Sequence, residues 1–253
     1  MSKKTSTAGT ADWKVKTLPD FKGKKAFVLP GAFYSACVGL MAEAGFTRAT
    51  SVADSDVVVF IGGEDINPAL YGQKNVKSYF TQERDDLEVE IYKRAQELGK
   101  VCFGICRGAQ FLHAMNGGTL WQDVNNHAGR SHYIVDLDED CRVLATSMHH
   151  QMLQDNDTLE VVAVAEEQVA TSFIDEDLHI DLNGKGVNAS HEVEVEAGTY
   201  PKTKCFFVQG HPEVGNPEYR SWTMQRLYDY FLDWTADDSG SQLAEILNKQ
   251  EVK

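Results

Sequence analysis

Residues 101–115, Val-Cys-Phe-Gly-Ile-Cys-Arg-Gly-Ala-Gln-Phe-Leu-His-Ala-Met, decide the fold that this sequence predicts. The apolar residues 101–104 indicate a short buried strand, and residues 107–115 indicate a helix that follows it. Between them lies a Gly-x-Cys-x-Gly pattern centred on Cys106, which is typical of a nucleophile on a sharp strand-to-helix turn. The stretch therefore predicts an α/β sheet with Cys106 at the carboxyl end of a strand, where open α/β folds bind their ligands.

The segments before this turn alternate between predicted strands and helices. Residues 26–29 and 57–61 are apolar runs expected as buried strands, and residues 34–44 and 83–98 have helical apolar spacing. This β-α-β-α order predicts three layers, with a mostly parallel central sheet and helices on both faces.

The second half of the chain has a different pattern, which predicts added, partly antiparallel strands. The expected strands are residues 133–135, 159–165, 192–195 and 205–208, followed by a last helix at 217–234. Glutamates alternate with valines over residues 192–196, so we expect these glutamates to line a solvated face.

One domain is expected at residues 25–236, because an open α/β sheet of this length usually folds as one unit. Residues 1–24 are polar and weakly patterned, which predicts a loose N-terminal arm. Residues 237–241 resemble a linker, so residues 237–253 are expected to form a C-terminal tail.

Charge and cysteine content limit the partners and the compartment. The 253 residues carry 24 basic and 38 acidic side chains, a formal charge of -14, which disfavours nucleic acid and anionic membranes as partners. The N-terminus lacks the apolar run of a secretory signal, and no long apolar span follows. Five cysteines without regular spacing suit a reducing compartment, so cytoplasm is expected.

A cysteine nucleophile needs a base and a group that orients the base. Among eight histidines, His211 follows a predicted strand and is separated by one residue from Glu213. Residues two apart in extended chain face the same way, so Glu213 can hold one ring nitrogen while the other meets Cys106. The remaining cysteines (Cys37, Cys102, Cys141 and Cys205) and His113 are expected to be packing residues, and His179 and His191 to be solvated.

These residues and several others carry a resemblance to a known family. The motifs are Gly104-Ile-Cys-Arg-Gly-Ala-Gln110, residues 116–123 (Asn-Gly-Gly-Thr-Leu-Trp-Gln-Asp) and Val208-Gln-Gly-His-Pro-Glu213. Over roughly residues 25–231 the chain resembles the class I glutamine amidotransferase superfamily, which implies a flavodoxin-like fold. Residues 62–72, Arg84-Asp85 through Glu88 and His149-His150-Gln151 most resemble its γ-glutamyl hydrolase branch, including the γ-glutamyl-γ-aminobutyrate type.

The resemblance implies a Cys-His-Glu triad, which falls on Cys106, His211 and Glu213. It also implies an oxyanion hole of backbone N–H groups, best assigned to Gly63 and Arg107, where prealigned donors stabilise a tetrahedral intermediate.

For the substrate, the resemblance assigns Gln110 to the amino-acid end, with His150 and Gln151 in the same pocket; the alternative for His149-His150 is that it only ends a strand. The chain departs from the family at Gly210, where a large aromatic usually precedes the catalytic histidine.

Several functions are compatible with these residues. The expected enzyme cleaves the γ-amide of glutamine or of a γ-glutamyl amine, either passing ammonia to a separate synthase or acting as a free-standing hydrolase, which the Asn67-Pro-Ala-Leu-Tyr71 loop favours. A small-molecule substrate is the expected partner, with no cofactor and no metal. Two alternatives are a catalytically inactive scaffold and a metal hydrolase, for which no His-Glu-x-x-His spacing is present. The metal hydrolase would use His127, His132, His149 and His150.

Overall fold

Five parallel strands form the half of the central sheet that carries Cys106. The computed structural model describes residues 11–182 and 193–250, with side chains described as far as residue 236. The parallel strands lie in the order β3-β2-β4-β5-β15. Their bounds are Lys25–Val28 (β2), Thr47–Arg48 (β3), Val57–Phe60 (β4), Val101–Ile105 (β5) and Cys205–Val208 (β15).

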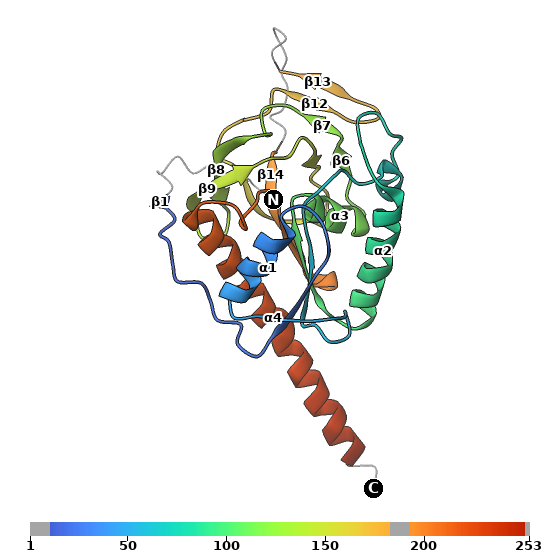
Figure 1. Cartoon of the computed structure of the whole chain (residues 1–253), viewed down its shortest axis with the longest axis vertical. Coiled ribbons are helices and arrows are strands. Elements are labelled where there is room, and N and C mark those ends of the chain that lie inside the picture. The colour runs from blue at the N-terminus through green and yellow to red at the C-terminus, as the bar shows by residue number, and fades with distance from the viewer. Residues whose placement is uncertain (1–10, 183–192, 251–253) are drawn as a thin grey trace.

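Helices cover both faces of this sheet, as expected (Figure 1). Alternate residues of β4 divide between two core clusters, because successive strand side chains point to opposite faces. Val57 and Val59 share a cluster with residues of α1 and α4, whereas Val58 and Phe60 share one with residues of α2 and α3. The helices are α1 (Tyr34–Glu43), α2 (Gln82–Glu97), α3 (Arg107–Met115) and α4 (Pro217–Gln250), with the 3-10 helices η1 (Pro68–Tyr71) and η2 (Pro201–Thr203).

Beyond β15 the sheet becomes antiparallel. The order from β15 is β14, β11, β8 and β9, with β1 added parallel to β9. Their bounds are Val195–Tyr200 (β14), Glu160–Ala165 (β11), Arg130–Asp136 (β8), Cys141–Ser147 (β9) and Ala11–Asp12 (β1). Short strands β6 (Leu120–Trp121) and β10 (Met152–Leu153) join β14, and β13-β12-β7 forms a small second sheet from His179–Asp181, Ser172–Ile174 and Asp123–Val124.

The expectation of a solvated glutamate face near residue 195 is wrong. Strand β14 lies inside the sheet between β11 and β15, so it is no edge. Glu194 is 4% exposed and Glu196 is fully buried. Histidines of neighbouring elements contact both carboxylates, which makes burial of the two glutamates possible. The alternation of Glu and Val in the sequence does not reveal these partners. His191 and Glu192 lie outside the described residues.

The expectation of a loose arm is also wrong from residue 11 onward. Strand β1 pairs with β9, Trp13 is buried and its Nε1–H donates to Ser221 Oγ at 2.9 Å. Phe21 is buried and stacks on Phe46 with 4.2 Å between ring centroids. Two buried aromatic side chains therefore hold this segment in place, although its sequence has little hydrophobic pattern.

The expected linker at residues 237–241 is helical, since α4 continues without a break to Gln250. In Figure 1 this end of α4 extends away from the rest of the molecule. Within the described residues, no helix combines the length and the apolar character needed to cross a bilayer.

Candidate active site

The carboxyl ends of three adjacent parallel strands meet at Cys106. β4 and β15 flank β5 on either side, with Phe60 opposite Gly104 and Val208 opposite Ile105. Each strand continues directly into the site: Gly62 follows β4, Cys106 follows β5 and His211 follows β15. Because parallel strands end at the same edge of the sheet, these segments converge although they lie far apart in sequence.

Cys106 occupies a sharp turn between β5 and α3. Its backbone has φ 53° and ψ -109°, outside the regions that L residues ordinarily adopt, and the residue is 7% exposed. A Cβ on Gly104 would lie 2.7 Å from the Gly108 oxygen, and one on Gly108 would lie 2.1 Å from the Phe60 oxygen. Glycine is therefore required on both sides of the turn. Cys106 is also the N-cap of α3, so it lies at the positive end of the helix dipole.

His211 lies between Cys106 and Glu213. Its Nδ1 is 2.7 Å from Glu213 Oε1, so the ring donates from Nδ1 and turns its other side to the sulfur. Burial would lower the pKa of His211, but hydrogen bonds to Cys106 and Glu213, with the charges of both, raise that pKa to about 10. An imidazolium held beside a cysteine can supply a proton to a leaving group.

Two features fix the position of the histidine. Its backbone N–H donates to Thr146 O of β9 at 3.1 Å, and the ring of Phe33 packs edge-on against it with 5.4 Å between centroids.

Cys37 of α1 lies against the glutamate, where burial and the charge of Glu213 raise the pKa of its thiol. Cys37 therefore remains a neutral packing residue.

The loop after β4 approaches the same sulfur. A Cβ on Gly62 would lie 3.0 Å from His211 Cε1 and 3.8 Å from Cys106 Cβ, so the Gly62 backbone borders the pair directly. Arg84 of α2 donates from Nη2 to the carbonyl oxygens of Ile61 and Gly62, both at 3.1 Å. In a trans peptide the N–H points opposite to the carbonyl, so the Gly63 N–H points away from Arg84.

A buried ion network joins this loop to the elbow. Arg84 pairs with Glu64 at 2.7 Å and with Glu88 at 2.9 Å, and Arg107 pairs with Asp85 at 2.5 Å and with Glu88. Arg107 is 1% exposed, so its guanidinium is held away from solvent while its backbone follows the nucleophile. The sequence motif around Arg84 indicated the family, but the positioning role of its charges is visible only in the structure.

Gln110 and Gln151 lie together, one helical turn beyond Cys106. The Gln110 backbone N–H donates to Cys106 O at 3.1 Å, and its side-chain amide donates to Gln151 O at 3.3 Å. The Gln151 amide donates to Ser78 Oγ at 2.7 Å. Both glutamines are buried, so these hydrogen bonds fix their side chains within the protein.

His150 lies with two aspartates rather than with the glutamines. Its Nε2 is 3.0 Å from Asp65 Oδ1 and its Nδ1 is 3.5 Å from Asp123 Oδ1. The hydrogen bond to Asp65 raises the pKa of His150, and 43% of its side chain is exposed. It does more than end a strand, because both of its ring nitrogens contact carboxylates.

Gly210, the departure from the family pattern, has a structural explanation. A Cβ at this position would lie 2.6 Å from Tyr219 Oη and 2.7 Å from Thr146 O. The Gly210 N–H donates to the same Tyr219 hydroxyl at 3.2 Å. Tyr219 of α4 therefore occupies the space into which a side chain at 210 would project.

The other histidines and cysteines divide as follows. His113 is buried; Thr119 O can only accept from its Nε2 (3.1 Å), so Nδ1 accepts from Tyr200 Oη at 2.9 Å. Burial lowers the pKa of His113 to about 4, which keeps it a neutral packing residue as expected. His179 is exposed, also as expected. The remaining cysteines are buried: Cys37, Cys102, Cys141 and Cys205.

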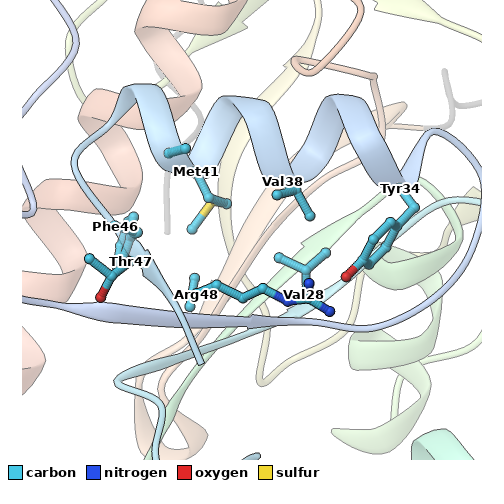
Figure 2. Close-up of a pocket in the computed structure, with 9 residues that line it drawn as sticks. Val28, Tyr34, Val38, Met41, Phe46, Thr47 and Arg48 are labelled. Carbon is cyan, nitrogen blue, oxygen red and sulfur yellow. The ribbon is translucent and has the colours of Figure 1, made fainter. Parts of the chain in front are cut away.

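A separate apolar hollow lies under α1, on the outer strands of the sheet. Figure 2 shows Val38 and Met41 of α1 facing Val28, with Arg48 extended beneath the helix toward Tyr34. Its lining contains none of the three triad candidates. The hollow is thus distinct from the site at Cys106.

Comparison with known proteins assigns the chain to a family. Residues 38–213 match the peptidase C26 family, a span that includes Cys106, His211 and Glu213. The chain belongs to the peptidase C26 family. The expected resemblance to class I glutamine amidotransferase-like proteins is thereby confirmed.

Three known proteins show different extents of similarity to this chain. The glutamine amidotransferase-like protein YvdE homolog of Lactococcus lactis subsp. cremoris is 32% identical over 121 residues, covering 40% of this chain and 64% of that relative. Protein NtpR of Enterococcus hirae is 24% identical over 86% of this chain and 94% of its own length. The structure of PurLQS from Thermotoga maritima superposes with a TM-score of 0.55 at 13% identity, covering 86% of this chain and 99% of that one. This last likeness confirms the mostly parallel, flavodoxin-like α/β fold.

Proposed function

We propose that this chain is a cysteine amidohydrolase that cleaves the γ-amide of glutamine or of a γ-glutamyl amine. The observation that carries the proposal is the convergence of Cys106, His211 and Glu213 at the carboxyl edge of the sheet, with His211 hydrogen-bonded to both partners. Membership of the peptidase C26 family and the relatives named glutamine amidotransferase-like support the same chemistry.

Acylation begins when the Cys106 sulfur attacks the γ-carbonyl carbon. The carbonyl oxygen becomes negative in the tetrahedral intermediate, and the backbone N–H groups of Gly63 and Arg107 stabilise it. His211 then gives its proton to the leaving nitrogen, the C–N bond breaks, and ammonia or an amine departs from a γ-glutamyl thioester.

Deacylation uses the same histidine in the opposite sense. His211 takes a proton from water, the hydroxide attacks the thioester carbon, and glutamate leaves as the Cys106 thiolate is restored. Gln110, one helical turn after Cys106, contacts Gln151, which supports the assignment of both to the amino-acid end of the substrate. His150, which pairs with Asp65, is assigned to the same pocket by the family resemblance.

The test is a panel of glutamine and γ-glutamyl amides, scored for glutamate and for ammonia or amine. Cys106→Ala is expected to lower turnover by at least about 10⁴-fold, since the nucleophile is lost. Cys141→Ala, which removes a buried thiol of β9 outside the site, is the matched control and is expected to keep activity. Equal turnover by wild type and Cys106→Ala would contradict the proposal.

The same assay separates the alternatives. Release of ammonia by the purified chain alone indicates a free-standing hydrolase, and release that rises sharply with a copurifying synthase indicates an amidotransferase. Failure to form a covalent adduct with a glutamine-mimicking electrophile indicates an inactive scaffold. Loss of turnover in a chelator with the Cys106 adduct still formed would indicate that a metal contributes.

A further inference from the structure

A buried cluster of three histidines and two glutamates lies where the antiparallel half of the sheet meets β14. His127 comes from the loop between β7 and β8, His132 from β8, and His149 from the loop between β9 and β10. Glu194 and Glu196 come from the start of β14. Four of these residues are at most 4% exposed, and only 10% of the His132 side chain is exposed.

The two carboxylates contact the three rings at short range. His132 Nε2 is 2.8 Å from Glu196 Oε1, and His127 Nδ1 is 3.4 Å from the same oxygen. His127 Nε2 is 3.1 Å from Glu194 Oε2, and His149 Nε2 is 3.8 Å from Glu196 Oε1. One carboxylate oxygen is therefore surrounded by three ring nitrogens.

The hydrogen bonds leave lone pairs directed at this oxygen. His149 Nδ1 lies 2.8 Å from Gln151 O, which can only accept, and 3.1 Å from Gln209 Nε2. With the proton on Nδ1 donated to Gln151 O, a neutral ring keeps a lone pair on Nε2. A proton on His127 Nε2 makes the bond to Glu194 and leaves a lone pair on Nδ1. His127 Nδ1, His149 Nε2 and Glu196 Oε2 lack a hydrogen-bond partner among the described residues.

This arrangement is unfavourable when the imidazoles are neutral and no cation is bound among them. Lone pairs of neutral imidazoles repel a carboxylate, and each buried polar atom without a partner costs about 1–3 kcal/mol. Two buried carboxylates also add two negative charges to an interior of low dielectric. A divalent cation among the nitrogens and Glu196 satisfies the lone pairs and offsets both charges.

We propose that the cluster binds one divalent transition-metal ion of the zinc class. His127 Nδ1, His132 Nε2 and Glu196 are the ligands, and His149 Nε2 is placed to close a fourth position. The ligand atoms of the first three lie within 4.8 Å of one another. Tetrahedral zinc with bonds of about 2.0–2.2 Å requires ligand atoms roughly 3.4 Å apart, so only side-chain adjustment is needed.

The surroundings of the cluster have the features of a metal site. Metal-bound histidines usually donate their second ring N–H to a carboxylate or carbonyl, as His127 does to Glu194 and His149 does to Gln151 O. Glu194 is itself fixed, since it accepts from Ala170 N at 2.7 Å and from Gln168 Nε2. Imidazole ligands suit zinc, copper, nickel and iron rather than calcium or magnesium.

A route from solvent reaches the cluster at His132. A surface pocket is lined by His132, Glu166, Glu167 and Gln168, with Arg142 on one wall paired to Glu166. The carboxylates of this pocket attract a cation toward His132, which is partly exposed, whereas the ligands His127 and Glu196 are fully buried. No metal is expected from the sequence, because these five residues are spread over 70 positions without a ligand motif. The metal-hydrolase alternative named the three histidines but neither glutamate.

The bound ion has a structural role beside the active site. Ser147 Oγ donates to His127 O at 2.6 Å. The side-chain amide of Gln209, two residues before His211, donates to Gln151 O at 3.0 Å. The metal thus ties two loops to β14, whose neighbour β15 leads to the catalytic histidine. The reaction at Cys106 takes no group from it.

The test measures metal binding to the full chain in a Cys106→Ala background, which removes the reactive thiol as a competing ligand. After dialysis against chelator, Zn²⁺ is titrated in competition with a chromophoric chelator, and Co²⁺ absorption reports the coordination. One ion per chain and a higher Tm are expected. Glu194→Gln should weaken binding about 10–100-fold, and His132→Gln at least as much. His179→Gln, at an exposed histidine, should leave binding unchanged.

Circular dichroism of each variant separates loss of metal from loss of fold. The proposal is overturned if the folded chain takes up no stoichiometric Zn²⁺ or Co²⁺, which would mean that the cluster holds protons only. It is also overturned if folded His132→Gln and Glu194→Gln bind as tightly as the Cys106→Ala parent. Neither result bears on amide hydrolysis, which the Cys106 assay measures separately.

Discussion

Cys106 combines the reactive sulfur with a strained backbone. Its φ of 53° and ψ of -109° are accessible to glycine but cost an L residue about 1–3 kcal/mol. The neighbouring glycines leave space for the turn, and the hydrogen bond from the Cys106 N–H to Val208 O at 2.9 Å holds it against β15. The strain is kept because it directs the sulfur toward His211.

Replacing Cys106 should therefore separate strain from chemistry. Cys106→Gly is expected to be more stable than Cys106→Ala by about 1 kcal/mol, because glycine adopts this conformation freely. The measurement is urea unfolding of both variants. Cys37, a buried cysteine within α1, is the matched control, and there glycine should be less stable than alanine by about 1 kcal/mol. The same sign at both positions would show that Cys106 is not strained.

The raised pKa of His211 predicts how stability depends on pH. The folded value of about 10 lies above the unfolded value of about 6.5, so the charged ring stabilises the folded state. This contribution is complete below about pH 6.5 and is lost as the pH rises through about 10. The free energy of unfolding of wild type minus that of His211→Gln should shrink over this window. A difference that stays constant with pH would contradict the assignment.

At the scale of elements, α2 and α3 are joined by buried ions rather than by apolar contacts alone. Arg107 at the start of α3 pairs with Asp85 and Glu88 of α2, and Arg84 of α2 reaches back to the carbonyls after β4. The two helices thus hold the backbone of both candidate oxyanion residues, Gly63 and Arg107.

Breaking this network should cost far more than breaking an exposed ion pair. Arg107→Met is expected to destabilise the fold by about 3–5 kcal/mol, because it leaves the buried Asp85 without its cation and Glu88 with Arg84 alone. Arg94→Met removes the exposed pair with Glu97 on the same helix α2 and should cost no more than about 1 kcal/mol. Thermal unfolding of both variants tests this, and similar losses would mean that the buried pairs contribute little.

At the scale of the whole molecule, the candidate site lies at the seam between the parallel and antiparallel halves of the sheet. β15 pairs parallel with β5 and antiparallel with β14. His211, three residues after β15, is held by β9 through its N–H bond to Thr146 O. Helix α4 spans this seam on one face (Figure 1). It is fastened to β8 by Asp136, which accepts from Trp222 Nε1 at 2.7 Å and from Arg226 Nε at 2.7 Å.

Asp136 should therefore be a strong contributor to global stability. Asp136→Ala is expected to cost about 3–5 kcal/mol, because the buried Arg226 loses the carboxylate that accepts its hydrogen bonds. Glu139→Gln alters an exposed carboxylate 3.9 Å from the same guanidinium and should change stability by less than about 0.5 kcal/mol. Chemical unfolding measures both. A loss at Asp136 as small as that at Glu139 would show that α4 is held by apolar packing alone.

The sequence by itself determined the features that depend on neighbours in the chain. The strand, elbow and helix around Cys106 occur where predicted, because apolar period and glycine spacing act over a few residues. The one-residue spacing of His211 and Glu213 likewise predicted a contact that the structure has at 2.7 Å. The fold class followed from the same local signals.

Only the tertiary structure decided which face of an element is buried and what lies against it. Alternation at Glu194 and Glu196 predicted that both side chains share a face, but that face lies in the interior, against histidines from distant parts of the chain. Trp13 is ordered by Ser221, more than two hundred residues away, and the space beside Gly210 is taken by Tyr219 of another element. Burial of a polar group depends on partners that the folded chain brings close, and no period in a single segment encodes those partners.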